Sequence, residues 1–125
     1  MHENDISYNI RKAVFNVYNT LGPGLLENVY EAALAYELNK LGHQVQTQVA
    51  LPVVYKDVKL ELGYRLDLFV DQKVIVEVKS VEELAKVHYK QLLTYLKLTD
   101  CKLGILINFN TGHLKENIVR VVNNL

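Results

Sequence analysis

The sequence has little of what small proteins use as covalent or metal staples. Cys101 is the only cysteine, so no internal disulfide can form, and no cysteine pair is spaced to hold structural zinc. The apolar runs are too short to predict a membrane span, and the polar N-terminus lacks the apolar core of a signal peptide. We therefore expect a cytoplasmic protein whose fold depends on its hydrophobic core alone.

An excess of charge of either sign is also missing. Fourteen Lys and Arg residues balance fourteen Asp and Glu residues, so the chain has no global positive field of the kind that drives tight nonspecific binding to nucleic acid. This balance counts against a histone-like or coat-type protein, but it permits an enzyme that gathers positive charge locally around one phosphate. With 125 residues, half of them apolar, we expect a single domain over residues 1–125.

The first forty residues predict two helices. Apolar residues recur at intervals of three and four from Asp5 to Leu21, and again from Gly24 or Leu25 to about Leu41. The intervening Gly22-Pro23-Gly24 stops the first helix and turns the chain. The core candidates of the second helix are Leu25, Leu26, Val29, Ala33, Tyr36 and Leu38.

The periodicity then changes to two, which predicts three consecutive antiparallel strands at 45–55, 58–70 and 74–79. Pro52 indicates an edge strand or a bulge in the first strand, and Gly63 indicates a bulge in the second. The apolar positions of the second strand are Val58, Leu60, Leu62, Tyr64, Leu66, Leu68 and Val70.

The remaining segments predict a helix and two more strands. Ser80-Val81-Glu82-Glu83 has the form of a capping box, so a third helix is expected from there to about Leu98. The apolar run at 102–109 is typical of a strand covered on both faces, and the β-branched segment 118–122 favours a short last strand. The fold class is therefore α/β, a mixed sheet flanked by helices.

A three-residue loop at 71–73 sets the register of the second and third strands. It places Val70 opposite Val74 and, by counting back, Asp67 opposite Glu77 and Arg65 opposite Lys79. The opposite face of this strand pair is apolar and is expected to be core. It comprises Leu66, Leu68, Val70, Val74, Val76 and Val78.

Two carboxylates that face each other repel, so one must take up a proton unless a cation is present. Oxygen ligands on a small open site suit Mg²⁺ or Mn²⁺, which keep several waters and share the remaining ligands with a substrate phosphate. Lys79, on the same face as Glu77, is placed to contact an attacking water or the charge that builds on phosphorus. The alternative is a surface salt-bridge ladder without a metal.

The third helix adds polar groups at the edge of its buried side. At 100° per residue, Leu84, His88, Gln91 and Tyr95 fall within one sector. Three lysines, at positions 86, 90 and 97, lie nearly opposite them. We interpret these lysines as a solvated face in preference to a DNA-binding stripe.

These residues together resemble a known family. Asp67, the triplet Glu77-Val78-Lys79, and the segment from Gln91 to Tyr95 are similar to the D…ExK…QxxxY pattern of the RecB-like branch of the PD-(D/E)XK nuclease superfamily. The segment Gly24–Tyr30 matches the signature of the GxxExxY proteins, a bacterial family placed in that superfamily. The resemblance implies a restriction-endonuclease-like αβββαβ core and a metal-dependent nuclease.

The resemblance also implies roles for individual residues. Asp67, Glu77 and the Val78 carbonyl correspond to metal ligands, Glu27 to the helix carboxylate that completes the metal site, and Lys79 to the catalytic lysine. Four further residues are assigned to substrate contact or support of the site. Gln91 and Tyr95 follow from the resemblance, Arg65 is inferred from strand geometry, and Tyr30 is the last residue of the Gly24–Tyr30 signature.

Three functions stay open at this point. The leading hypothesis is a Mg²⁺- or Mn²⁺-dependent nuclease acting on nucleic acid, with DNA expected in preference to RNA. A second is a non-catalytic nucleic-acid-binding or assembly module that retains the nuclease fold. A third is an enzyme subunit that takes its specificity from a partner protein, and a homodimer is a further option. The sequence identifies no general base.

Overall fold

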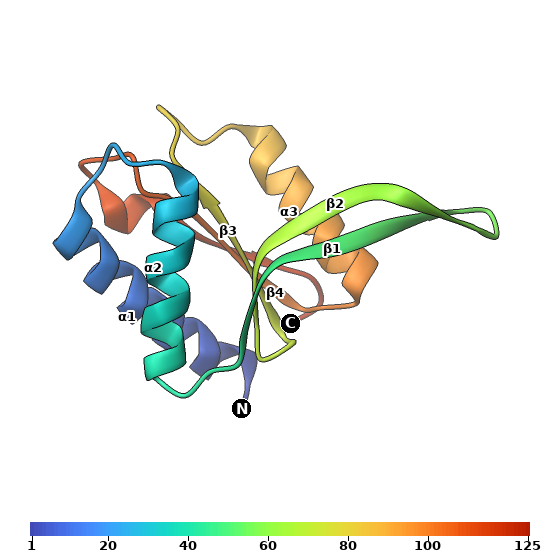
Figure 1. Ribbon diagram of the computed structural model, residues 1–125, viewed down its shortest axis with the longest axis horizontal. Coiled ribbons are helices and arrows are strands. Elements are labelled where there is room, and N and C mark those ends of the chain that lie inside the picture. The colour runs from blue at the N-terminus through green and yellow to red at the C-terminus, as the bar shows by residue number, and fades with distance from the viewer.

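The chain forms a mixed sheet with helices on both faces (Figure 1). The computed structural model describes residues 1–60 and 63–125, and describes 61 and 62 only as positions within a strand. The elements in chain order are α1 (Glu3–Leu21), α2 (Glu27–Lys40), β1 (Val45–Tyr55), β2 (Val58–Val70), β3 (Val74–Lys79), α3 (Lys86–Thr99), β4 (Leu103–Asn108), the short 3₁₀ helix η1 (Leu114–Asn117) and β5 (Ile118–Val122).

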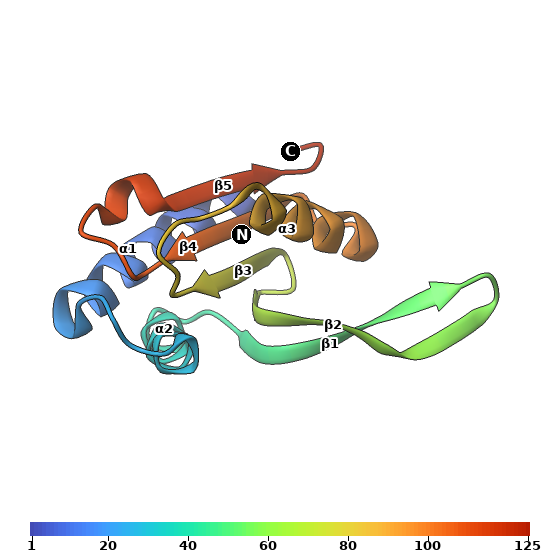
Figure 2. The same ribbon diagram turned by 90° about the horizontal axis from the view of Figure 1, so that it is seen from above.

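The sheet has five strands in the order β1-β2-β3-β4-β5. Strands β3 and β4 are parallel, and the other neighbours are antiparallel. Helix α1, beside α2, and helix α3 lie on opposite faces of the central strands (Figure 2), so every residue of β4 is buried. The α/β fold class predicted from the sequence is confirmed, as are β4 and β5. Among the described helices, none is long and apolar enough to cross a membrane.

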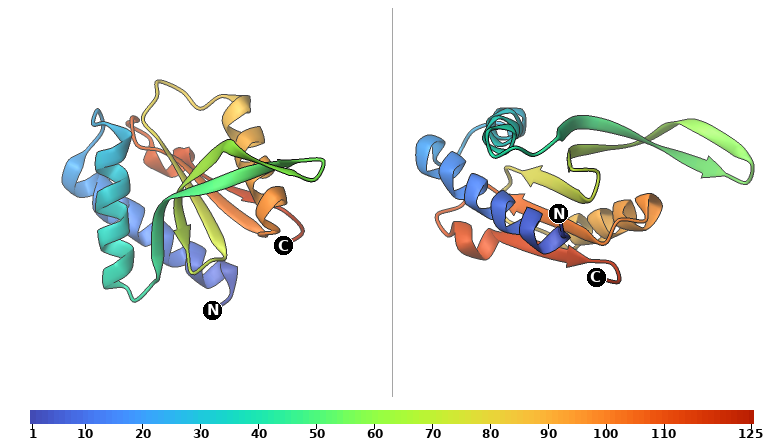
Figure 3. Two further views of the ribbon diagram at one scale, coloured as in Figure 1. Left: turned by 45° about the vertical axis from the view of Figure 1, so that its right-hand side comes forward. Right: turned by 90° about the horizontal axis from the view of Figure 1, so that it is seen from below.

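Strands β1 and β2 continue past the sheet as a twisted two-stranded ribbon. We call residues 49–65 the arm, and Figure 3 shows from two sides that its tip extends beyond the rest of the molecule. The pairing register shifts between Pro52, which pairs with Gly63, and Val53, which pairs with Leu60. A Cβ atom at Gly63 would collide with the Leu51 carbonyl oxygen, so this close approach requires glycine. The predicted irregularity is confirmed; the side chain of Leu62 lies outside the described residues.

Two apolar clusters stabilise the sheet, one on each face. Helices α1 and α2 pack on Leu68, Val70 and the even-numbered residues of β3, whereas α3 packs on Leu66 and Ile75. Leu66 was predicted to share the face of Leu68, and this is wrong. Gln48 adopts a positive φ of 49° between the pairs Thr47–Leu68 and Val49–Leu66. The local kink turns Leu66 toward α3.

Helix α2 is rotated relative to the sequence-based prediction and begins later, at Glu27. Its buried residues are Tyr30, Leu34 and Leu38, whereas Leu26 is 73% exposed and Leu25, Val29 and Tyr36 are also exposed. The rotation is set by Tyr30, whose ring stacks on Phe109 at a centroid distance of 4.3 Å. The Tyr30 hydroxyl donates to the Gly22 carbonyl at 2.5 Å and accepts from the Leu25 amide at 3.1 Å.

Helix α3 begins at Lys86 and not at Ser80. Ser80 cannot act as its N-cap, because its amide donates to Glu27 and its hydroxyl donates to the Leu25 carbonyl. The side chain of His88 instead accepts the Ala85 amide at 2.9 Å, which satisfies one free donor of the first turn. Residues 80–85 therefore form a loop directly after Lys79.

Candidate active site

The candidate site lies where β2 separates from β3. The described ladder between these strands ends at the Leu68–Val76 pair, one position before Asp67 and Glu77. Side chains replace the missing backbone bonds: the Asp67 amide donates to Glu77 Oε2 at 2.9 Å, and the Val78 amide donates to Asp67 Oδ2 at 2.8 Å. Asp67 and Glu77 therefore lie side by side, as the register predicted from the loop, although the backbone ladder ends one pair before them.

Arg65 does not lie opposite Lys79, as the register predicted. Because β2 turns away from β3 after Leu68, Arg65 pairs with Ala50 of β1. Its Nη1 donates to the Gln48 carbonyl at 3.2 Å. Arg65 therefore belongs to the base of the arm, on the far side of the kink from Asp67.

Glu77 is a buried carboxyl group, 3% exposed. Burial and, to a lesser extent, the negative charge of Asp67 raise the pKa of Glu77 from 4.5 to about 8, against the opposing effects of the hydrogen bond from the Asp67 amide and the charge of Lys79. A carboxylate removed from water beside another carboxylate requires either a proton or a cation to neutralise it.

A third carboxylate, Glu31 of α2, joins the site and was missed at the sequence level. Gln48 Nε2 donates to Glu31 Oε1 at 2.5 Å and lies 3.5 Å from Asp67 Oδ1. Burial raises the pKa of Glu31, and the Asp67 charge adds to this effect. The pKa of Asp67 is raised as well, mainly by burial and against the Val78 amide. The available signal was spacing, because Glu27 and Glu31 lie one helical turn apart.

Lys79 supplies positive charge at the end of β3. It is partly buried, and its charge acts to lower the pKa of both Asp67 and Glu77. Among the described residues the single ion pair is His43–Asp71, so the Lys79 ammonium forms none with a described carboxylate. No described residue accepts a hydrogen bond from this ammonium, so within the described part of the chain its three donors are available to a ligand.

Glu27, at the start of α2, is held beside the loop that follows Lys79. Its Oε2 accepts the Ser80 amide at 2.9 Å, and its charge raises the pKa of Asp67 as a smaller contribution. Asn108, which the sequence analysis did not select, fixes the next residue: its side chain accepts the Val81 amide at 3.0 Å and donates to the Val81 carbonyl at 2.9 Å. A polar residue near the end of an apolar run was the available signal.

The α3 side of the site is aromatic. Tyr95 is 3% exposed, and its ring lies 5.2 Å from that of Tyr64 on the arm. Burial and, to a lesser extent, the charges of Glu77 and Asp67 raise the pKa of Tyr95 to about 12, while the hydrogen bond with the Gln91 side chain acts in the opposite direction. Of the predicted sector, Tyr95 lies near enough to Glu77 and Asp67 for their charges to act on it, whereas Leu84 precedes the helix. Tyr30, by contrast, is a core residue that fixes the loop before Glu27.

The candidate site offers two carboxylates to a metal ion. In the described part of the chain, no group of three or more His, Cys, Asp or Glu side chains is arranged so that it could hold a metal ion. Mg²⁺ does not need such a cage, because it binds through one or two carboxylates and keeps several waters. Asp67 and Glu77 provide that pair, and each offers only carboxylate oxygen atoms to a metal ion. The residues present fit Mg²⁺ or Mn²⁺.

Comparison with known proteins agrees with this geometry. No curated protein matches the chain. The model of one protein family, described as the PD-(D/E)XK nuclease superfamily, matches residues 4–121. This range contains α1 without Glu3, β5 without Val122, every element between them and every candidate residue named above. Membership of the narrower GxxExxY family stays a prediction. Since the match extends over almost the whole sequence, the chain belongs to the PD-(D/E)XK nuclease superfamily.

Proposed function

We propose that this protein is a metal-dependent nuclease that hydrolyses phosphodiester bonds in nucleic acid, with DNA as the expected substrate. The observation that carries the proposal is the carboxyl group of Glu77, almost sealed from water, beside Asp67 and with Lys79 at the end of the same strand. Burying two carboxylates lowers the stability of the folded protein. A bound divalent cation neutralises their charge, and relief of their repulsion adds to the free energy of cation binding.

The ion would be held by Asp67, Glu77 and the Val78 carbonyl, with Glu27 and Glu31 as further carboxylates nearby. A bound Mg²⁺ or Mn²⁺ supplies Lewis-acid polarisation of a phosphoryl oxygen and lowers the pKa of a water. Asp67 and Glu77 are rigidly positioned for this role, because each carboxylate accepts an amide from the opposite strand.

The remaining residues have supporting roles in this proposal. Lys79 donates to the attacking water or to the negative charge that develops on phosphorus. Tyr95 and Gln91 line the α3 side and support the carboxylates or contact the substrate strand. Arg65 contacts a neighbouring phosphate from the base of the arm, and Tyr30 acts indirectly by fixing the loop before Glu27.

A calorimetric titration with Mn²⁺ tests the proposal. Asp67→Asn is the matched variant, because the amide oxygen of Asn can still accept the Val78 amide while the negative charge is lost. We expect wild type to bind Mn²⁺ and the variant to bind at least tenfold more weakly. Both proteins are then incubated with labelled DNA and RNA, and we expect Mn²⁺-dependent cleavage by wild type only. Wild type that neither binds Mn²⁺ nor cleaves would contradict the proposal.

A second candidate is a non-catalytic nucleic-acid-binding or assembly module that retains this fold. One observation favours it: both carboxylates already bridge the gap between β2 and β3 through backbone amides, which is a structural role that needs no metal. Under this hypothesis wild type binds nucleic acid equally well in Mn²⁺ and in EDTA. Affinity for nucleic acid that rises with Mn²⁺ would contradict it.

Assembly and location also remain proposals. We propose that residues 1–125 act as one cytoplasmic domain and that two copies, or one copy and a partner protein, form the active species. A homodimer would present two sites to a branched substrate. Light scattering tests this directly, since a monomeric mass that persists at full nuclease activity removes both forms of assembly.

A further inference from the structure

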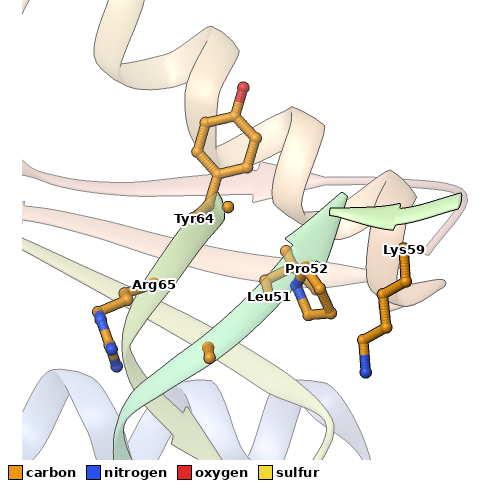
Figure 4. A pocket seen from close by; sticks show the side chains of 7 residues that line it. Leu51, Pro52, Lys59, Tyr64 and Arg65 are labelled. Atoms are coloured by element: carbon orange, nitrogen blue, oxygen red, sulfur yellow. The ribbon is translucent and has the colours of Figure 1, made fainter. Parts of the chain in front are cut away.

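A cavity of about 260 Å³ opens on the arm, outside the carboxylate site. Leu51 and Pro52 of β1 and Gly63 of β2 form part of its wall. In Figure 4, Arg65 and Lys59 lie on opposite sides of Leu51 and Pro52. Figure 4 shows the side chains of Lys59 and Arg65 extending to the same side of the ribbon, whereas Tyr64 points away from them. We call this cavity the arm pocket.

The arm pocket has the chemistry of an anion site. The Arg65 guanidinium carries five N–H donors, of which one is used by the Gln48 carbonyl. Lys59 adds an ammonium with three donors. Among the described residues, neither side chain forms an ion pair with a carboxylate, and both are exposed. An arginine fork and a lysine point charge are each suited to bind the oxygens of a phosphate group.

The arm pocket is joined to the carboxylate site through Gln48. The backbone of Gln48 accepts from Arg65, and its side chain lies between Glu31 and Asp67. Arg65 and Asp67 are two residues apart on β2, a rise of about 7 Å at 3.3–3.4 Å per residue. That length is about the axial rise of two nucleotides in B-DNA, so one strand can reach both places.

The cations of the arm pocket also offset the repulsion between the site carboxylates and a nucleic acid. The carboxylates of Asp67, Glu77 and Glu31 repel a nucleic acid, and the chain as a whole has no net positive charge to offset them. Attraction must then come from local cations close to the site. Lys59 and Arg65 provide two such cations on one side of the arm.

We propose that the arm pocket is a phosphate-binding subsite in which Arg65 and Lys59 each hold a backbone phosphate of the nucleic-acid strand, the phosphate at Arg65 lying about two nucleotides from the bond at Asp67 and Glu77. The inference rests on the proposed function, since it names a subsite for that substrate. The arm thereby positions the strand and adds affinity that does not depend on sequence.

Fluorescence anisotropy with a labelled DNA duplex in EDTA tests the subsite without cleavage. Lys59→Ala is the main variant, because Lys59 forms no hydrogen bond or ion pair among the described residues. Arg65→Ala is the second, with thermal melting to check that it folds. Lys56→Ala is the matched control: Lys56 is on the same arm but lies over the Tyr55 ring and does not line the pocket.

We expect Lys59→Ala to weaken binding about 5- to 10-fold at 0.1 M salt and to reduce the slope of log K against log salt by about one. Lys56→Ala should change neither quantity. Equal binding by Lys59→Ala and wild type, or an equal loss in Lys56→Ala, would overturn the subsite. If the subsite is overturned but wild type still cleaves DNA in Mn²⁺, the proposed nuclease function stands. Wild type that neither binds nor cleaves DNA would overturn both the subsite and the proposed nuclease function.

Discussion

Replacing Glu77 with Gln tests whether the buried carboxyl group sets the pH dependence of stability. Gln has nearly the same shape, and its Oε1 can still accept the Asp67 amide that Glu77 accepts at 2.9 Å. The substitution therefore removes the ionisable group and keeps the packing. Without a divalent cation, any difference between the two proteins reports the cost of ionising Glu77.

The sign and size of the effect follow from the raised pKa. The pKa of Glu77 is about 8 in the folded protein and 4.5 as its ordinary value, so between these pH values the folded state holds more protons than the unfolded chain. Stability of the wild type must then fall as pH rises through this window. At 1.36 kcal/mol per pH unit and per proton, the loss between pH 5.5 and 7.5 is about 2–3 kcal/mol.

Thermal melting in EDTA from pH 5 to 8.5 measures this loss. We expect the wild-type Tm to fall by about 10 °C relative to that of Glu77→Gln between pH 5.5 and 7.5. Adding Mn²⁺ should restore the wild type at high pH and leave the variant unchanged, because only the carboxylate binds the cation strongly. Parallel pH profiles of the two proteins in EDTA would refute the reasoning.

Three further predictions concern single residues. Lys79→Ala should lower cleavage by at least 100-fold while the protein stays folded, and undiminished turnover of a labelled substrate would exclude Lys79 from the reaction. Tyr30→Phe should cost about 1–2 kcal/mol in urea unfolding, since the buried hydroxyl makes two hydrogen bonds; a cost near zero would show that water replaces them. The hydrogen bonds from His43 and the Gln44 amide outweigh burial and lower the pKa of Asp71. Asp71→Asn should therefore destabilise the protein by about 1–2 kcal/mol at pH 7, and the difference should vanish as pH falls below the pKa of Asp71; a difference that persists at pH 2 would contradict this.

Local patterns were sufficient to predict most of the elements. The alternation along β1, β2 and β3 and the apolar run of β4 predicted these strands and their order along the chain. Side-chain periodicity is informative here because it reflects which faces are buried. The three-residue turn was enough to place Asp67 beside Glu77. Helix starts were less predictable. Ser80 has the residue type of an N-cap, but its hydrogen bonds are taken by Glu27 and Leu25, which are distant in sequence.

The rest was decided by contacts between distant segments. The rotation of α2 depends on the stacking of Tyr30 against Phe109, and it exposes leucines whose spacing alone favoured the core. Arg65 joined the arm because β2 leaves β3 at the kink beside Gln48, and a positive φ at a single residue has no periodic signature in the sequence. The sequence by itself was sufficient to select Asp67, Glu77 and Lys79 as candidate site residues and to place them on two neighbouring strands. Only the tertiary structure decided how deeply Glu77 is buried, that Glu31 joins it, and that the arm carries two cations away from Lys79, because burial and charge at a site are sums over neighbours that the chain brings together only on folding.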